Sequence, residues 1–455
     1  MGSQVLFIGH ILFWILGGCT ALLPLRWAIP CYLLVAQIDS SGADLASAST
    51  LGIENTLKVI VLPTLLLLRI GWKKYKVLNW SPLAKSWLLF FSYVVIAALW
   101  SPFQLSAMKM IGYLYSYSVL FLVFSYAWAE GWIDEKVLAA IVFVTLAFAT
   151  VQTYLMGDLF GASDGENRFT TFSDTESFAA FLIALLSLLI FSAETQSRRR
   201  RIVCIIGLVL GIILTGSRYV FLGLVLAFLA ASIFYTLRAA KKIRLGLLLR
   251  RVSMGLVPTI LLIGLITQFF PQNRLNQLTN LTHPQGVEDI GTFGFRLAMY
   301  QVTLGQLEGR DTRELLFGTG TSSGANAAIQ FDPNVYTIDT VDGNRIIHDE
   351  FLRAFYEWGA VGLLFFILFV VQLFKSSFDL LRRSRTRGAM AFLAIFPTLL
   401  IGLAVGNVLA EAGLPGGTGY VLVLACAAAS RFQPRAGHGR ETDGGALSVA
   451  QGGVA

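Results

Sequence analysis

The sequence predicts an all-α protein, a polytopic membrane helical bundle of about 12 spans with one long polar loop that contains short helices. Of its 455 residues, 55% are hydrophobic and only 14% are charged. A soluble domain of this size needs far more charge to cover its surface. The mean hydropathy is +0.68, and the apolar residues form blocks about as long as the hydrocarbon core of a bilayer requires.

The predicted spans follow one another through most of the chain. They cover residues 5–23, 57–72, 86–101, 108–128, 135–155, 177–193, 202–216, 219–237, 252–270, 351–374, 388–410 and 416–430. Residues 27–38 are apolar but short and have Pro24 and Pro30 close by, so they form either a re-entrant piece or a thirteenth span. The first block lacks a basic leader and a clear cleavage site, so we expect it to be retained.

Four regions follow from this pattern. They are an N-terminal transmembrane bundle (1–270), a polar loop (271–349), C-terminal transmembrane helices (350–430) and a cytoplasmic tail (431–455). The tail is rich in glycine, alanine and polar residues, which is typical of a disordered segment. The loop is the only other long polar stretch, so we expect the functional site there.

Basic residues cluster in alternate loops between the predicted spans, at 69–76, 198–201, 238–251 and 375–387. Counting through the spans puts all four clusters on one side, which the positive-inside rule assigns to the cytoplasm. The 271–349 loop then lies on the opposite side, which is the periplasmic face in a cell with an envelope. This topology accounts for the net charge of +8, so no nucleic-acid partner is expected.

Three arginines lie on the outer side, where the rule makes basic residues sparse: Arg168, Arg218 and Arg296. Each can be explained individually by snorkelling at the interface, or by an ion pair with Asp174 or Glu176. Three together beside a long polar loop favour an anionic ligand. The planar guanidinium group suits phosphate because it donates two parallel hydrogen bonds.

His348 stands at the end of the loop, where a membrane helix begins. Asp349 and Glu350 follow it and suit the positive N-terminal end of a helix, so His348 is either incidental to that start or functional. A neutral imidazole at this boundary can accept a proton near physiological pH. Of the other histidines, His10 is expected to be a satisfied polar residue within the first span.

Residues 318–324 are glycine-rich but lack the Lys-Ser/Thr pair of a nucleotide-binding loop. We expect them to form a flexible turn or a backbone wall of the site. Residues 294–307 predict a helix of mixed face, with Arg296 turned inward and apolar residues toward lipid.

No metal-binding motif is found on the outer face. Neither HExxH, CxxC nor a carboxylate cluster is present there, and Asp174 with Glu176 is the nearest approach. We therefore expect neither a metal nor a cofactor.

Four short motifs occur in order along the predicted outer face. They are Gly216-Ser217-Arg218, Gly294-Phe295-Arg296, Gly318-Thr319-Gly320, and His348-Asp349-Glu350-Phe351-Leu352 followed by Glu357-Trp358-Gly359. With these motifs the chain resembles the O-antigen ligase and O-antigen polymerase superfamily, which are membrane glycosyltransferases of the GT-C type. The resemblance departs from the family at Asp349, where asparagine is usual. It departs also around Arg168, which lacks the usual glycine and Pro-Asn pair.

The resemblance implies transfer of a glycan from undecaprenyl diphosphate to an acceptor hydroxyl at the bacterial inner membrane. His348 would be the general base, and Arg218 and Arg296 would bind the diphosphate in place of a metal. Arg168, Arg345 and Asp349 would complete the substrate-binding set. The acceptor would be a growing glycan or lipid A-core.

Several functions remain open within and beyond this superfamily. A ligase, a polymerase and a protein O-oligosaccharyltransferase share the donor and differ in the acceptor. A flippase or polysaccharide transporter for lipid-linked sugars is the alternative outside the class. Transporters often carry charged residues in mid-span, and the nearly charge-free span interiors expected here disfavour that alternative.

Overall fold

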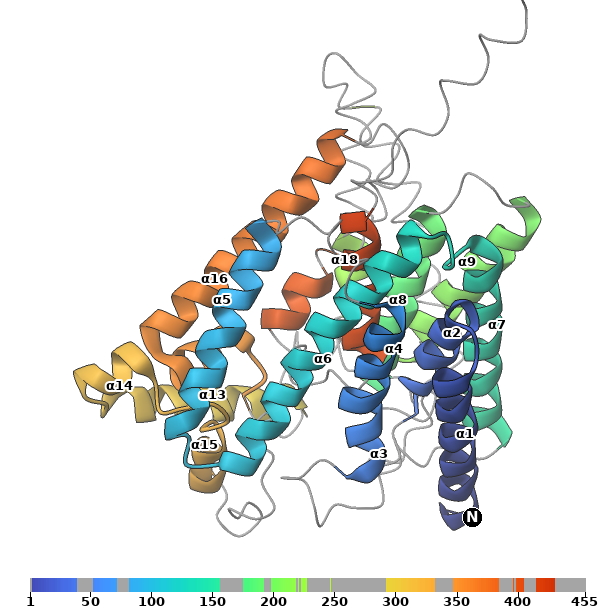
Figure 1. Cartoon of the computed structure of the whole chain (residues 1–455). Helices are drawn as coiled ribbons and strands as arrows, with labels where there is room; N and C mark the ends of the chain where they lie inside the picture. Colours follow the sequence, from blue (N-terminus) through green and yellow to red (C-terminus); the bar gives the residue numbers. More distant parts are fainter. Residues whose placement is uncertain are drawn as a thin grey trace, which may run out of the picture.

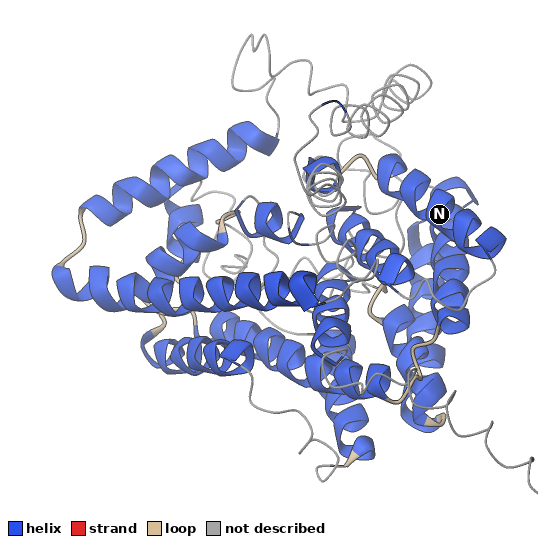
Figure 2. Cartoon of the chain, turned by 90° about the horizontal axis from the view of Figure 1, so that it is seen from above, coloured by secondary structure: helices blue, strands red, loops and turns tan. Residues whose placement is uncertain are grey.

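A computed structural model of the chain describes most of the predicted helical segments. The described residues are 2–38, 52–71, 82–155, 175–191, 198–217, 220, 222–226, 246, 292–331, 347–383, 396, 398–404 and 415–429. Every regular element among them is a helix, and no strand occurs in this part of the chain (Figure 2). The all-α prediction is confirmed. The predicted span 252–270, most of 219–237 and 388–410, and the tail 431–455 lie outside the described residues.

The helices match the predicted spans closely at most boundaries. In the N-terminal part they are α1 (Gly2–Leu22), α2 (Leu25–Val35), α3 (Ile53–Thr56), the π-helical turn η3 (Leu57–Val61), α4 (Leu62–Ile70), α5 (Pro82–Ala97), the 3-10 turn η5 (Ala98–Trp100), α6 (Gln104–Ala129), α7 (Glu135–Thr150), the π-helical turn η6 (Val151–Leu155), α8 (Thr175–Phe191) and α9 (Arg198–Leu214). The later helices are α13 (Thr292–Glu308), α14 (Thr312–Phe317), α15 (Ala325–Phe331), α16 (Glu350–Arg383) and α18 (Pro415–Ala429).

Four described helical stretches are long and apolar enough to cross a membrane. They are Pro82–Trp100, Gln104–Ala129, Lys136–Thr153 and Glu350–Ser376. The membrane character is thereby supported, whereas the number of about 12 spans stays a prediction.

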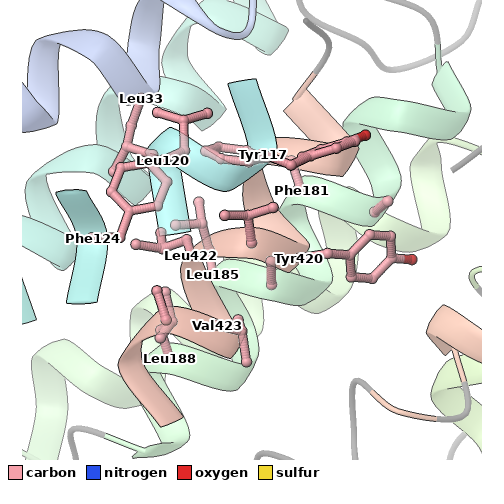
Figure 3. Packing of buried hydrophobic residues seen from close by; sticks show 14 of the residues in the cluster. Leu33, Tyr117, Leu120, Phe124, Phe181, Leu185, Leu188, Tyr420, Leu422 and Val423 are labelled. Atoms are coloured by element: carbon pink, nitrogen blue, oxygen red, sulfur yellow. The ribbon is translucent and has the colours of Figure 1, made fainter. Parts of the chain in front are cut away.

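The C-terminal helix α18 lies in the middle of the bundle, against α6 and α8 (Figure 3). Its contact is close because Gly419 carries no side chain where a Cβ would come within 2.8 Å of the Cβ of Ala184. Small residues of this kind allow helices in a membrane to approach one another. The core around it includes Leu422 and Val423 of α18, Phe181, Leu185 and Leu188 of α8, and Tyr117, Leu120 and Phe124 of α6.

Helix α5 runs alongside α16 on the other side of the molecule (Figure 1). Aromatic rings join the two helices: Phe90 of α5 lies 5.2 Å from Trp358 and 5.3 Å from Phe366, measured between ring centroids. The short helices of the polar loop lie at one end of the α5–α16 pair.

Helices α1 and α4 are parallel, which differs from the predicted alternation of consecutive spans. The guanidinium group of Arg69, near the end of α4, donates to the carbonyl oxygens of Thr20, Ala21 and Leu23 at the end of α1. The two C-terminal ends therefore lie together, and Arg69 caps α1 as a basic residue near a helix C-terminus does. Helix α2 lies against both α1 and α4, but its 11 residues fall short of a full crossing, so the two alternatives for residues 27–38 stay open.

His10 has the partner that was expected for a polar residue in the first span. Its Nδ1 atom lies 2.8 Å from Oε1 of Glu54 in α3. That pair joins α1 to α3.

Candidate functional site

Three short helices of the polar loop gather at one end of α5, α6 and α16 (Figure 1). Helix α14 lies against α16, and α13 lies against α15. The second contact is held by Met299 of α13, which is fully buried with Ala325, Ala327 and Ala328. The expectation of a loop with short helices is confirmed for its described part, residues 292–331.

Helix α13 has the mixed face that its sequence predicts. Met299 and Thr303 are fully buried, whereas Leu297 and Leu304, seven residues apart, are about half exposed. The side chain of Arg296 is 16% exposed and therefore turns toward the protein. Tyr300 follows Arg296 by four residues, so the two side chains lie on the same face one turn apart.

Arg296 faces a carboxylate from a distant helix. Its Nη2 atom lies 3.4 Å from Oε1 of Glu176, in the first turn of α8. The ion pair that the sequence offered as an alternative explanation is thus present. Both side chains keep partial exposure, 16% for Arg296 and 40% for Glu176, so the contact is a weak one. The guanidinium group of Arg296 thus has a protein carboxylate as a partner, and its role in binding an anionic ligand stays a prediction.

The backbone of His348 is held from two sides. The hydroxyl of Tyr300 donates to the carbonyl oxygen of His348 at 2.8 Å. The next residue, Asp349, caps α16: its Oδ1 atom accepts the backbone N–H groups of Phe351 at 2.8 Å and Leu352 at 3.0 Å. The helix-start role predicted for Asp349 is present, and a functional role of His348 stays a prediction.

The electrostatics of this cluster follow from its partial burial. Burial raises the pKa of Asp349 above its usual value, although its two backbone hydrogen bonds oppose the rise. Burial also raises the pKa of Tyr300 to about 12, with the charge of Asp349 adding to the rise and that of Arg296 opposing it. The charges of Asp349 and Arg296 thus both act on the phenol of Tyr300, whose hydroxyl bonds the backbone of His348.

Three further predicted site residues, Arg168, Arg218 and Arg345, lie outside the described residues. The turn that precedes Arg218 is described: α9 ends at Leu214, and Gly216 has a positive φ of 67°. The diphosphate-binding role of these arginines stays a prediction.

The glycine-rich turn 318–324 binds an anion, but the anion belongs to the protein. The carboxylate of Glu357 in α16 accepts the N–H of Ser322 at 2.8 Å and that of Gly324 at 3.3 Å. Its backbone carbonyl accepts the N–H of Gly320 at 2.9 Å. Ser322 adopts a positive φ of 68° at this point, which is uncommon for a residue with a side chain. The turn is a fixed part of the scaffold, not a flexible loop.

Helix α16 is broken at Gly359, where φ is 63° and ψ is −169°. The break removes helical partners from the preceding carbonyl oxygens, and other elements replace them. The carbonyl oxygen of Tyr356 accepts a hydrogen bond from Nη1 of Arg310 at 2.6 Å. The carbonyl oxygen of Trp358 accepts one from the hydroxyl of Tyr93 at 3.2 Å. A broken helix at membrane depth is tolerated only where protein satisfies the freed groups in this way.

Both glycines at the break are required by space. A Cβ on Gly359 would lie 2.5 Å from the backbone nitrogen of Gly318, and one on Gly318 would lie 2.1 Å from the carbonyl oxygen of Glu357. No side chain fits between these two backbones. The Gly318 and Glu357-Trp358-Gly359 motifs thus form one contact.

Three charged residues are fully buried at the beginning of α16, which departs locally from the nearly charge-free span interiors expected from the sequence. Arg353 lies between two carboxylates, with Nη1 at 3.2 Å from Glu350 and Nε at 3.4 Å from Glu357. Buried charges in a span can mark a transport path. Here Arg353 pairs with both carboxylates, and Glu357 holds the glycine-rich turn. The spacing of three and four residues could have indicated these pairs from the sequence.

Among the described residues no group of three or more His, Cys, Asp or Glu side chains is placed to hold a metal ion. Since Asp174 lies outside that part of the chain, the predicted metal independence stays a prediction.

Comparison with known proteins finds one family. Residues 202–367 match the family described as O-antigen ligase. The matched range contains α13, α14, α15 and the broken beginning of α16, and it includes every described site residue except Glu176. The family resemblance inferred from the four motifs is thereby confirmed. No curated protein matches the chain at a significant level.

Proposed function

With membership of the O-antigen ligase superfamily supported by residues 202–367, we propose that this chain is a membrane glycosyltransferase. It moves a glycan from undecaprenyl diphosphate to an acceptor hydroxyl at the periplasmic face of the bacterial inner membrane. The acceptor is a growing glycan or lipid A-core. The observation that carries the proposal is the α13 face, because Arg296 stands one turn from Tyr300, whose hydroxyl bonds the carbonyl of His348.

In the proposed reaction His348 takes the proton from the acceptor hydroxyl. The acceptor oxygen then forms a bond to the anomeric carbon, while the bond from that carbon to the diphosphate oxygen breaks. The electron pair leaves on the diphosphate, where charge develops. Arg296, with Arg218, Arg168 and Arg345, stabilises this charge through fixed guanidinium groups that substitute for a metal cation.

The contact with Glu176 is evidence for an anion-binding role of Arg296. A carboxylate oxygen already lies 3.4 Å from the guanidinium group, in a pair that keeps contact with solvent. A diphosphate carries more charge and more acceptor oxygens than a carboxylate, so it is the stronger ligand for this position.

The decisive variants are His348→Ala and Arg296→Ala, assayed as purified protein with a polyprenyl-diphosphate-linked glycan. We expect His348→Ala to lower the transfer rate by about 10²- to 10⁴-fold while donor binding persists. We expect Arg296→Ala to weaken donor binding by about 10- to 100-fold, the worth of hydrogen bonds to a charged group.

Matched controls exist for both variants. His10→Ala removes a histidine of α1 whose partner is Glu54 of α3. Arg313→Ala removes an exposed arginine from α14. Full transfer activity in His348→Ala would exclude the general-base role, and unchanged donor affinity in Arg296→Ala would exclude the diphosphate role.

The acceptor class is distinguished by deleting the gene and separating the surface glycan on a gel. A glycan capped at one repeat indicates a polymerase, and long chains left on the lipid carrier indicate a ligase. A transporter would show neither transfer in purified form nor dependence of transfer on His348.

A further inference from the structure

Tyr300 lies at the centre of the candidate site and belongs to none of the four sequence motifs. Its hydroxyl reaches from α13 to the loop before α16 and donates to the carbonyl oxygen of His348 at 2.8 Å. Its own helix is anchored by the neighbouring residue Met299, which is fully buried against α15. The donor is therefore presented by a packed element.

The carbonyl of His348 needs such an outside donor. The first carbonyl of the α16 ladder is that of Asp349, which accepts the N–H of Arg353 at 2.9 Å. The carbonyl of His348 comes one residue before that of Asp349 and accepts none of the helical hydrogen bonds of α16. The Asp349 cap holds the chain just after His348, and Tyr300 holds the carbonyl of His348 itself.

Tyr300 also connects the base to the anion-binding side chain. Arg296 and Tyr300 lie one turn apart on α13, so any shift of this helix moves both. Burial, with Asp349 nearby, raises the pKa of Tyr300 to about 12, so the phenol stays protonated and remains a donor through the working range.

We propose that Tyr300 is a positioning residue, which sets the distance between His348 and the diphosphate held by Arg296. This inference rests on the proposed function. Tyr300 does not touch the reacting atoms. Its hydrogen bond keeps the imidazole aimed at the acceptor hydroxyl when the donor is bound, and misplacing a reacting group by about 1 Å costs about 10²-fold in rate.

The test is Tyr300→Phe, which removes one hydroxyl and keeps the ring. In transfer by the full-length enzyme we expect kcat to fall by about 10- to 100-fold. The KM for the polyprenyl-diphosphate donor should stay within about twofold, because Arg296 and its helix remain in place. The control is Tyr115→Phe, which removes a hydroxyl 3.0 Å from that of Thr64, between α6 and α4. Both variants should show similar thermal unfolding midpoints, and only Tyr300→Phe should lose kcat.

Each other result overturns the inference. An unchanged kcat does so, as does a loss seen only in KM or a loss that follows the unfolding midpoint and is shared by Tyr115→Phe. His348→Ala separates this inference from the function beneath it. If His348→Ala is inactive while Tyr300→Phe keeps full kcat, only the positioning role fails. If His348→Ala is fully active, the proposed function fails.

Discussion

Two charged clusters meet at the beginning of α16, and they differ in how completely they are closed. Around Glu357 every group is fully buried, and the carboxylate holds two backbone N–H groups and Arg353. Around Arg296 the side chains keep partial exposure, and the nearest carboxylate lies 3.4 Å away. A fully desolvated charge that lies against opposite charges and backbone donors holds the fold, because removing its partners would be costly. A charge that keeps contact with solvent is available to a ligand.

The largest expected effect is at the fully buried cluster around Glu357. Glu357→Gln leaves Arg353 short of a charge partner and puts an amide against backbone donors, so we expect a loss of about 3–5 kcal/mol in unfolding free energy. The measurement is the unfolding of purified protein in detergent. Glu308→Gln, at an exposed position at the end of α13, should change it by less than about 0.5 kcal/mol. A small effect of Glu357→Gln would contradict the scaffold assignment.

Gly359→Ala should be the next most damaging change. The positive φ costs about 1–3 kcal/mol for a residue with a side chain, and the overlap with Gly318 adds to it. Gly305→Ala is the matched control, because a Cβ at Gly305 meets nothing within 4 Å. It should raise stability slightly, by about 0.5–1 kcal/mol, as alanine does in a helix. Equal thermal midpoints for the two variants would refute the space requirement.

Much of the fold can be predicted from the sequence because long apolar segments indicate helices that cross a membrane. Residues 351–374 were predicted as a span, and α16 begins at Glu350. The contact between Glu357 and Ser322 is not legible, because nothing local signals a pairing across 35 residues. The parallel course of α1 and α4 was missed because Arg69 was counted only as a topology marker.

The candidate site was predictable in part. His348, Arg296 and Asp349 were named from the sequence, and Tyr300 of the helix that carries Arg296 bonds the backbone of His348. The functional roles of the three residues stay predictions, and Arg168, Arg218 and Arg345 lie outside the described residues. Tyr300 was missed, although its spacing of four residues from Arg296 indicated a shared face. Its partner is a backbone carbonyl, and sequence motifs do not report backbone partners.

Asp349 stands between the two clusters and should show an intermediate effect. Asp349→Ala removes the cap of α16 and should cost about 1 kcal/mol, whereas Asp349→Asn should keep it. Because burial raises the folded-state pKa of Asp349, its ionisation is less favourable in the folded than in the unfolded chain. Wild-type stability relative to Asp349→Asn should therefore fall as pH rises through that raised pKa, then stay constant. Unfolding midpoints of the two proteins from acidic to neutral pH test this, and a difference that does not vary with pH would argue against it.

The smallest effect is expected at the partly exposed cluster around Arg296. Glu176→Gln removes an anion that competes with the donor for Arg296, so undecaprenyl diphosphate should bind about two- to fivefold more tightly. The gain should shrink at high salt, because the pair is partly exposed. Equilibrium binding measures it, with Glu308→Gln as the charge-matched control. Weaker binding would mean that Glu176 supports Arg296 instead of competing with the ligand.

The break in α16 bears on the order in which the protein is made. The donors to the carbonyl oxygens of Tyr356, Glu357 and Trp358 come from Arg310, Gly320 and Tyr93, respectively. All three donors precede the break along the chain, so synthesis from the N-terminus delivers them before the broken helix emerges from the ribosome. A fragment that began after α15 would carry these carbonyl groups into lipid without those donors. Co-translational insertion thus requires α5 to be in the membrane before α16 arrives.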